Sequence, residues 1–87
     1  MKTFQLNITS PDGKMFSDEV QMLTVRGVAG DLAILAGHIP FVTTLKPCDC
    51  KLVLPDGNEK IGTTDGGILT VAAEQTTLLS GSFKWKE

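Results

Sequence analysis

The stretch Gly30-Asp31-Leu32-Ala33-Ile34-Leu35-Ala36-Gly37-His38-Ile39-Pro40-Phe41 contains most of the information about the fold of this chain. It combines glycines, an acid, a short aliphatic run, one His and one Pro, and it lacks the 3.6-residue period of an amphipathic helix. Residues 32–35 are nearly continuously apolar, which is typical of a strand that is buried on both sides or lies at a corner. Glycines and a proline bound this run, so we expect loops at both ends.

Segments with a period of two residues flank this stretch on both sides. Phe4, Leu6 and Ile8 alternate with polar residues, which predicts a half-buried strand. Two Pro-Asp-Gly turns, at 11–13 and 55–57, punctuate the chain, and turn signals recur about every ten residues. The predicted strands cover residues 4–8, 15–20, 22–25, 32–35, 41–45, 48–54, 59–63, 68–73 and 76–80, and the alternating tail 83–87 extends the last of them.

These patterns predict an all-β fold, a small β-sandwich of about ten short, mostly antiparallel strands. The chain has 87 residues and no linker-like or low-complexity tract, so we expect one domain over residues 1–87.

Charge and hydropathy exclude several classes of partner. The net charge is −2, and the eight Lys and Arg residues are scattered along the chain, which argues against nucleic acid. No apolar run approaches the roughly 18 residues that span a bilayer, and the N-terminus has no apolar signal region. We therefore expect a cytoplasmic location and no direct contact with a membrane.

The sequence carries few residues for chemistry. It contains no phosphate-binding G-x-x-x-x-G-K-[ST] loop and no G-x-S-x-G nucleophile elbow, and it has one His and no Tyr. We expect neither catalysis, nor a cofactor, nor a small-molecule substrate. The Gly66-Gly67 pair favours a bulge or tight turn over an anion-binding nest.

Cys48 and Cys50 flank Asp49, so in a strand their side chains point to the same face. Their Cα atoms would lie about 6.5 to 7 Å apart, at or beyond the limit for a disulfide. A reduced pair is the expectation. A zinc site requires about four ligands, and His38 is the only further soft ligand.

The opening stretch resembles a signature of the epsilon subunit of the F-type ATP synthase, approximately G-E-x-G-I-L-P-G-H-x-P-L followed by Leu-Lys-Pro. The matching residues are Gly30, Asp31, Ile34, Leu35, Gly37, His38, Pro40 and the step Leu45-Lys46-Pro47. The first strand, the polar turn at 10–14 and the Gly66-Gly67 pair before an aliphatic strand also follow the family order, so the resemblance covers nearly the whole chain.

The resemblance implies a non-catalytic central-stalk subunit of a membrane-associated rotary motor, on the cytoplasmic face of a bacterial membrane. In this family the sandwich binds the gamma subunit and rests on the c-ring, so that ion-driven rotation is coupled to ATP synthesis. Ser10, His38 and Thr43 match positions at the gamma interface, with solvated hydroxyls and a packed loop His as the alternatives. Asp31 matches an acid that faces the polar, partly basic loops of the c-ring, with a solvated turn carboxylate as the alternative.

The chain departs from the family pattern at several points. Asp31 stands where the family usually has Glu, Ala36 replaces a Pro, and Asp65 stands where Ser is common. Cys48 replaces a Gly, so its backbone must avoid positive φ or accept strain. The family's helical hairpin is not present after the sandwich, either because the chain is naturally short or because it was shortened. A stand-alone binding module for a peptide or glycan is the alternative, and an exposed aromatic platform would favour it.

Overall fold

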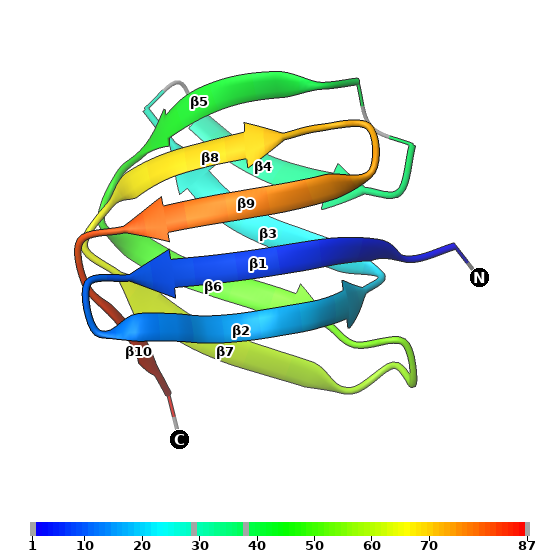
Figure 1. Cartoon of the computed structure of the whole chain (residues 1–87), viewed down its shortest axis with the longest axis horizontal. Coiled ribbons are helices and arrows are strands. Elements are labelled where there is room, and N and C mark those ends of the chain that lie inside the picture. Colours follow the sequence, from blue (N-terminus) through cyan, green and yellow to red (C-terminus); the bar gives the residue numbers. More distant parts are fainter. Residues whose placement is uncertain (1, 29, 38, 87) are drawn as a thin grey trace.

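The computed structural model describes residues 2–28, 30–37 and 39–86, and the described residues form ten strands and no helix (Figure 1). The strands are β1 (Phe4–Ser10), β2 (Gly13–Val20), β3 (Met22–Gly27), β4 (Gly30–Leu35), β5 (Phe41–Leu45), β6 (Cys48–Val53), β7 (Glu59–Thr64), β8 (Gly67–Val71), β9 (Gln75–Ser80) and β10 (Phe83–Trp85). The predicted all-β fold class is confirmed.

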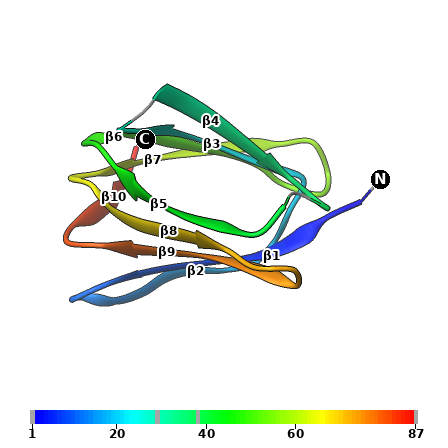
Figure 2. The ribbon, with the colours of Figure 1, turned by 90° about the horizontal axis from the view of Figure 1, so that it is seen from above.

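The strands lie in two layers that face each other (Figure 2). One layer has the order β5-β8-β9-β1-β2, and the other contains β3, β6, β7 and β10, with β4 paired to the outer side of β3. The layers join at a corner where Gly27 of β3 pairs with Leu45 of β5. All pairings are antiparallel except β1 with β9, which confirms the predicted mostly antiparallel arrangement.

The core lies between the layers because alternate side chains of each strand point inward. In β1, for example, Leu6 and Ile8 are fully buried while Asn7 between them is only half-buried. The buried apolar side chains are Leu6, Ile8, Val20, Leu23, Val25, Ile34, Leu45, Cys50, Leu52, Leu69, Val71, Leu78 and Phe83.

One strand prediction is wrong, and of the two alternatives for another, one is excluded. The tail does not extend the preceding strand: the chain turns at residues 81–82, and β10 pairs antiparallel with β7, where Trp85 lies opposite Gly62. The aliphatic run 32–35 is not buried on both sides either. Only Ile34 is buried, and Ala33 and Leu35 are exposed, because β4 lies at the edge of its layer with its outer face open to solvent.

The Gly66-Gly67 pair comes close to the backbone of the two strands beside β8, Leu45 of β5 and Leu79 of β9. Both residues have positive φ, 116° and 149°. A Cβ on Gly67 would lie 2.0 Å from the carbonyl oxygen of Leu79, so a side chain cannot be accommodated. No described residue other than glycine has positive φ, so Cys48 avoids the strain that a left-handed conformation would impose.

Candidate functional site

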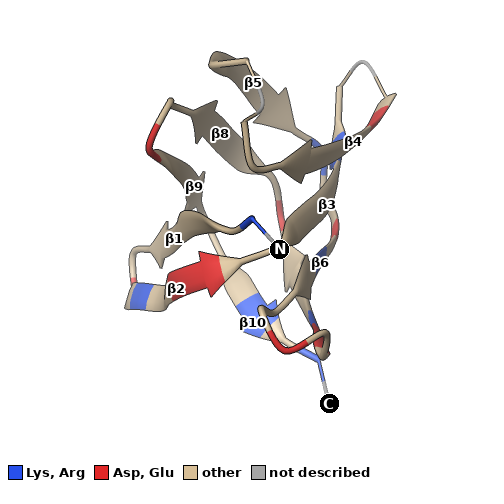
Figure 3. Cartoon of the chain, turned by 90° about the vertical axis from the view of Figure 1, so that its right-hand side faces the viewer, with Lys and Arg blue, Asp and Glu red and all other residues tan. Residues whose placement is uncertain are grey.

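The outer face of the β5-β8-β9-β1 layer is the most distinctive surface of the molecule. These four strands contain no charged residue, and Figure 3 shows their ribbons uniformly tan. Charges appear only at the borders, in β2 and in the turns. We call this surface the uncharged face. Its outward side chains are Gln5, Asn7, Thr9, Val42, Thr44, Ile68, Thr70, Gln75, Thr77 and Leu79.

Three large aliphatic side chains form the apolar part of the uncharged face. Val42, Ile68 and Leu79 are 66%, 46% and 51% exposed. Ile68 and Leu79 lie directly opposite each other on β8 and β9, and Val42 lies on β5 one row further along. Directly opposite side chains in a sheet are in contact distance, and diagonal ones lie somewhat further apart on the same face. Ile68 and Leu79 are directly opposite and Val42 is diagonal to Ile68, so the three residues lie together across three strands.

A ladder of amides and hydroxyls covers the other half of the uncharged face. Asn7 Nδ2 donates to Gln75 Oε1 at 3.1 Å, and Ser17 Oγ donates to Asn7 Oδ1 at 2.8 Å. Gln5 Nε2 donates to Asn7 Oδ1 at 3.1 Å and to Ser17 Oγ at 3.2 Å. These groups satisfy one another and hold their side chains in fixed positions, so this half is polar and ordered.

The outer face of the second layer is charged instead. Every one of its strands, β3, β4, β6, β7 and β10, carries at least one charged residue. Three ion pairs lie there: Arg26–Asp31 at 2.9 Å, Lys51–Glu59 at 3.1 Å and Lys86–Asp49 at 2.9 Å. Hydrogen bonds from Lys86 and Thr63 lower the pKa of Asp49. The two faces therefore present different chemistry to a partner.

The tip of the β3–β4 hairpin holds the acid that was predicted to face the c-ring. Asp31 is exposed and lies directly opposite Arg26, whose Nε donates to Asp31 Oδ1 at 2.9 Å. This hydrogen bond and the charge of Asp31 raise the pKa of Arg26. The sequence alone points to Asp31 but not to its partner Arg26.

The residues predicted at the gamma interface lie at different places. Ser10 is the last residue of β1, is only 7% exposed, and its Oγ accepts the backbone N–H of Asp12 at 3.2 Å. Thr43 is half-buried on β5, at an inward position between the outward residues Val42 and Thr44. The strands β8 and β9 separate the two residues, so the structure does not bring them together. His38 lies outside the described residues.

The sequence analysis did not identify Val42, Ile68 and Leu79 as functional. The only signal in the sequence was that four separate segments lack charged residues. These segments form one uncharged surface only because the fold makes them neighbours. Arg26 was also missed, because the five-residue offset to Asp31 is a cross-strand contact only when the hairpin register is known.

The cysteines are reduced and do not form a reactive pair. Cys50 is fully buried, and burial raises the pKa of its thiol to about 12. Cys48 is half-buried, and its Sγ accepts the backbone N–H of Arg26 at 3.4 Å. Among the residues described, no group of three or more His, Cys, Asp or Glu side chains is arranged to hold a metal ion.

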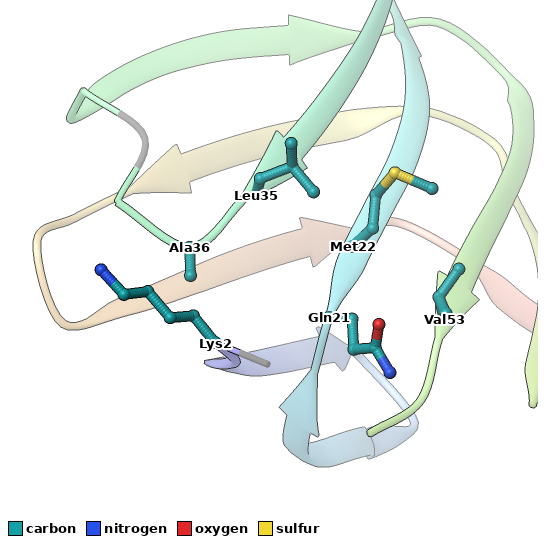
Figure 4. A pocket seen from close by; sticks show the side chains of 6 residues that line it. All are labelled: Lys2, Gln21, Met22, Leu35, Ala36 and Val53. Carbon is teal, nitrogen blue, oxygen red and sulfur yellow. The ribbon is translucent and has the colours of Figure 1, made fainter. Parts of the chain in front are cut away.

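A hollow of about 320 Å³ lies on the outer face of the second layer (Figure 4). Its lining is mainly aliphatic, from β3, β4 and β6, and the lining residues are Lys2, Gln21, Met22, Leu35, Ala36 and Val53. It contains no acid, thiol or hydroxyl that could act as a base or nucleophile. The part of the chain that the structure describes also offers no helix able to cross a bilayer.

Comparison with known proteins identifies the family. The model for the beta-sandwich domain of the ATP synthase delta/epsilon chain matches residues 3–86. The chain belongs to this family. The resemblance seen in the opening motif is thereby confirmed, and the ten-stranded sandwich is the family's domain.

Two curated members of the delta/epsilon family show the extent of the similarity. The chain is 36% identical over 86 residues to the sodium-ion-specific ATP synthase epsilon chain of Acetobacterium woodii, covering 99% of this chain and 65% of the relative. It is 41% identical over 80 residues to the ATP synthase epsilon chain of Bacillus velezensis, covering 92% of this chain and 60% of the relative. The chain thus spans 60% to 65% of the length of these relatives.

Chains of two solved structures share the fold. A chain of the Euglena gracilis mitochondrial ATP synthase, in a structure that contains OSCP, F1 and the c-ring, superposes with a TM-score of 0.90 at 21% identity, covering 95% of this chain and 53% of that chain. A chain of the Tetrahymena thermophila mitochondrial ATP synthase central stalk and c-ring superposes with a TM-score of 0.76 at 13% identity, covering 94% of this chain and 66% of that chain.

Proposed function

We propose that this chain is the β-sandwich part of an ATP synthase epsilon subunit that binds the gamma subunit through the uncharged face and touches the c-ring through the β3–β4 tip. In this role the domain passes torque from the ion-driven ring to the gamma shaft. It acts at the cytoplasmic face of the membrane and meets the bilayer only through the c-ring.

The observation that supports the gamma contact is the uncharged face. Protein interfaces have an apolar centre that is depleted in charge and is surrounded by a polar rim. Val42, Ile68 and Leu79 supply such a centre, and the hydroxyl and amide side chains around them supply the rim. Exposed apolar side chains that gather on one face indicate an interaction surface, whereas scattered single ones do not.

Ser10 and Thr43 lie at the edge of the same proposed contact, and His38, which lies outside the described residues, is included because of the motif match alone. Thr43 directly follows Val42 on β5, and Ser10 begins the turn that borders the face beyond β1. Because Ser10 is buried and Thr43 half-buried, a charge at either position would also disturb folding. Single alanine substitutions, each checked for folding by circular dichroism, are therefore the suitable test of these residues. Unchanged affinity for gamma in all three variants would remove them from the contact.

The decisive experiment compares two isoleucines on opposite faces. Ile68 lies on the uncharged face at 46% exposure, and Ile61 lies on the charged face at 38% exposure. Each is replaced by Lys, and each variant is co-expressed with the cognate gamma subunit and titrated against it. We expect Ile68→Lys to weaken gamma binding by at least about tenfold, because a Lys would be buried without a partner, and Ile61→Lys to bind normally. Equal affinities for the two variants would show that gamma does not cover the uncharged face.

The proposed role requires no chemistry from the domain itself. The sequence has no phosphate-binding loop, and neither the hollow nor the uncharged face contains a set of catalytic groups. The chain alone is expected neither to hydrolyse ATP nor to bind it. Calorimetric titration with Mg-ATP tests this, and micromolar binding would contradict it.

The stand-alone binding module gains no support from the aromatic residues. Phe83 is buried against Trp85 with ring centroids 4.9 Å apart, and Phe16 packs against the same Trp at 5.9 Å. Phe4 and Phe41 pack against the core. The large exposed apolar side chains among the described residues are all aliphatic, so they form no aromatic platform for a glycan.

A further inference from the structure

The β3–β4 tip presents two charges of opposite sign, not a single acid. Arg26 and Asp31 are register partners, joined by an Nε–Oδ1 contact of 2.9 Å. Their side chains are 62% and 72% exposed, so both remain accessible to another molecule. The guanidinium carries five N–H donors, and its hydrogen bond to Asp31 is made by the donor on Nε.

Backbone hydrogen bonds hold this tip against the neighbouring strands. The N–H of Val28 donates to the carbonyl oxygen of Thr44 at 3.2 Å, and the N–H of Lys46 donates to the carbonyl oxygen of Arg26 at 3.1 Å. The N–H of Arg26 donates to Cys48 Sγ. Because the β3 side of the turn is bonded at Arg26 and Val28 to residues 44, 46 and 48, and β4 is paired to β3, the tip presents its charges at a fixed place on the sandwich.

The formal charges at the tip do not favour a purely basic partner. Arg26 and the exposed Lys46 contribute two positive charges and Asp31 contributes one negative charge, so the net charge is +1. A basic group that approaches Asp31 meets repulsion from Arg26 at nearly the same distance. The electrostatic fields of two neighbouring opposite charges cancel at long range. Only a partner with an acidic group opposite Arg26 and a basic group opposite Asp31 is therefore attracted by both.

We propose that Arg26 is a second contact residue at the tip, and that the loop it meets carries an acidic group opposite Arg26 as well as a basic group opposite Asp31. This inference rests on the proposed contact between the tip and the c-ring. In place of a contact between Asp31 alone and basic groups, the tip makes a bipolar contact through Arg26 and Asp31. The order and spacing of the two charges then select the partner loop. Arg26 then contributes attraction of its own in addition to orienting Asp31.

The test uses the assembled enzyme with variants of this chain. F1 sectors that contain each variant are titrated onto F1-depleted membrane vesicles, and restored ATP-driven proton or sodium uptake gives the concentration for half-maximal rebinding. The variants are Arg26→Gln, Arg26→Lys, Asp31→Lys and the charge swap Arg26→Asp with Asp31→Arg. Lys51→Gln is the matched control, because it breaks an exposed pair on the same layer away from the tip. The ATP hydrolysis rate of each free F1 sector checks its integrity.

We expect Arg26→Gln to raise the half-maximal concentration by about two- to fivefold, which is the scale of an exposed ion pair, and Arg26→Lys to stay near wild type. The charge swap keeps the internal pair but reverses the polarity, so we expect it to bind more weakly than Arg26→Gln. Lys51→Gln should rebind as wild type does.

The alternatives give different results. If Arg26→Gln rebinds as tightly as wild type or more tightly while Asp31→Lys rebinds more weakly, the partner presents only basic groups and the bipolar contact is refuted. If neither Asp31→Lys nor the charge swap changes rebinding in fully assembled enzyme, the tip does not meet the c-ring, and the proposed c-ring contact fails together with this inference.

Discussion

We predict that residue 62 must be glycine because the Phe83 ring packs directly against its backbone. Gly62 is buried on β7, opposite Trp85 of β10. A Cβ built on Gly62 would lie 2.3 Å from Phe83 Cζ and 2.7 Å from Phe83 Cε1. The Phe83 ring cannot simply swing away, because it is itself buried and packs edge-on against Trp85. Gly62→Ala should therefore force the ring and the β7–β10 pair apart.

Two effects of opposite sign determine the size of the change. Overpacking a core costs about 1 to 3 kcal/mol. Replacing a glycine by alanine also restricts the unfolded chain, which stabilises the fold by about 0.4 to 1 kcal/mol. The overpacking effect is the larger here because the contact is with a buried ring, so we expect a net loss of about 1 to 2 kcal/mol in the free energy of unfolding.

Urea unfolding measures this loss, with the fluorescence of Trp85 and far-UV circular dichroism as independent probes. The unfolding midpoint should fall by about 1 M with little change in slope. The double variant Gly62→Ala with Phe83→Leu is the control: the smaller side chain relieves the clash, so the double variant should lose less stability than the sum of the single variants. A Gly62→Ala protein that is at least as stable as wild type would refute the packing argument, because the clash would then cost no more than the stabilisation of about 0.4 to 1 kcal/mol gained from the unfolded chain.

Two further predictions concern titration. Burial raises the pKa of Cys50 from 9.0 to about 12, so between these pH values the unfolded chain releases a proton that the folded chain keeps. The free energy of unfolding, measured with urea, should therefore fall as pH rises through this window, and it should fall less steeply in Cys50→Ala. An equal slope in both proteins would contradict the raised pKa. Hydrogen bonds from Lys86 and Thr63 lower the pKa of Asp49, so the contribution of Asp49 to stability is present above its ordinary pKa and is lost as pH falls through the lowered pKa. NMR titration of the Asp49 carboxyl should give a midpoint below 3.8 that rises in Lys86→Ala. A midpoint that stays the same in Lys86→Ala would show that the ion pair does not form in solution.

The sequence was sufficient to predict most of the strands and the family. A period of two residues is a local property, so Phe4, Leu6 and Ile8 indicated both the first strand and its buried face. The glycine-rich motif around Asp31 fixed the family because it combines residue types at set spacings, and the family model over residues 3–86 confirmed it. The tail was harder to assign: its alternation showed that residues 83–85 form a strand, but alternation does not specify the partner, which proved to be β7.

The tertiary structure decided which surface is available and what its charges do. Val42, Ile68 and Leu79 belong to three strands, and in the sequence each stands directly beside another apolar residue, so no local pattern sets them apart. They become one patch because strand order and register place β5, β8 and β9 side by side, with Leu79 opposite Ile68 and Val42 diagonal to it. In the same way Asp31 reads as a lone acid in the sequence, and only the hairpin register pairs it with Arg26. Alternation along one strand determines which side chains share a face, whereas the composition of a whole face depends on contacts between segments far apart in the chain.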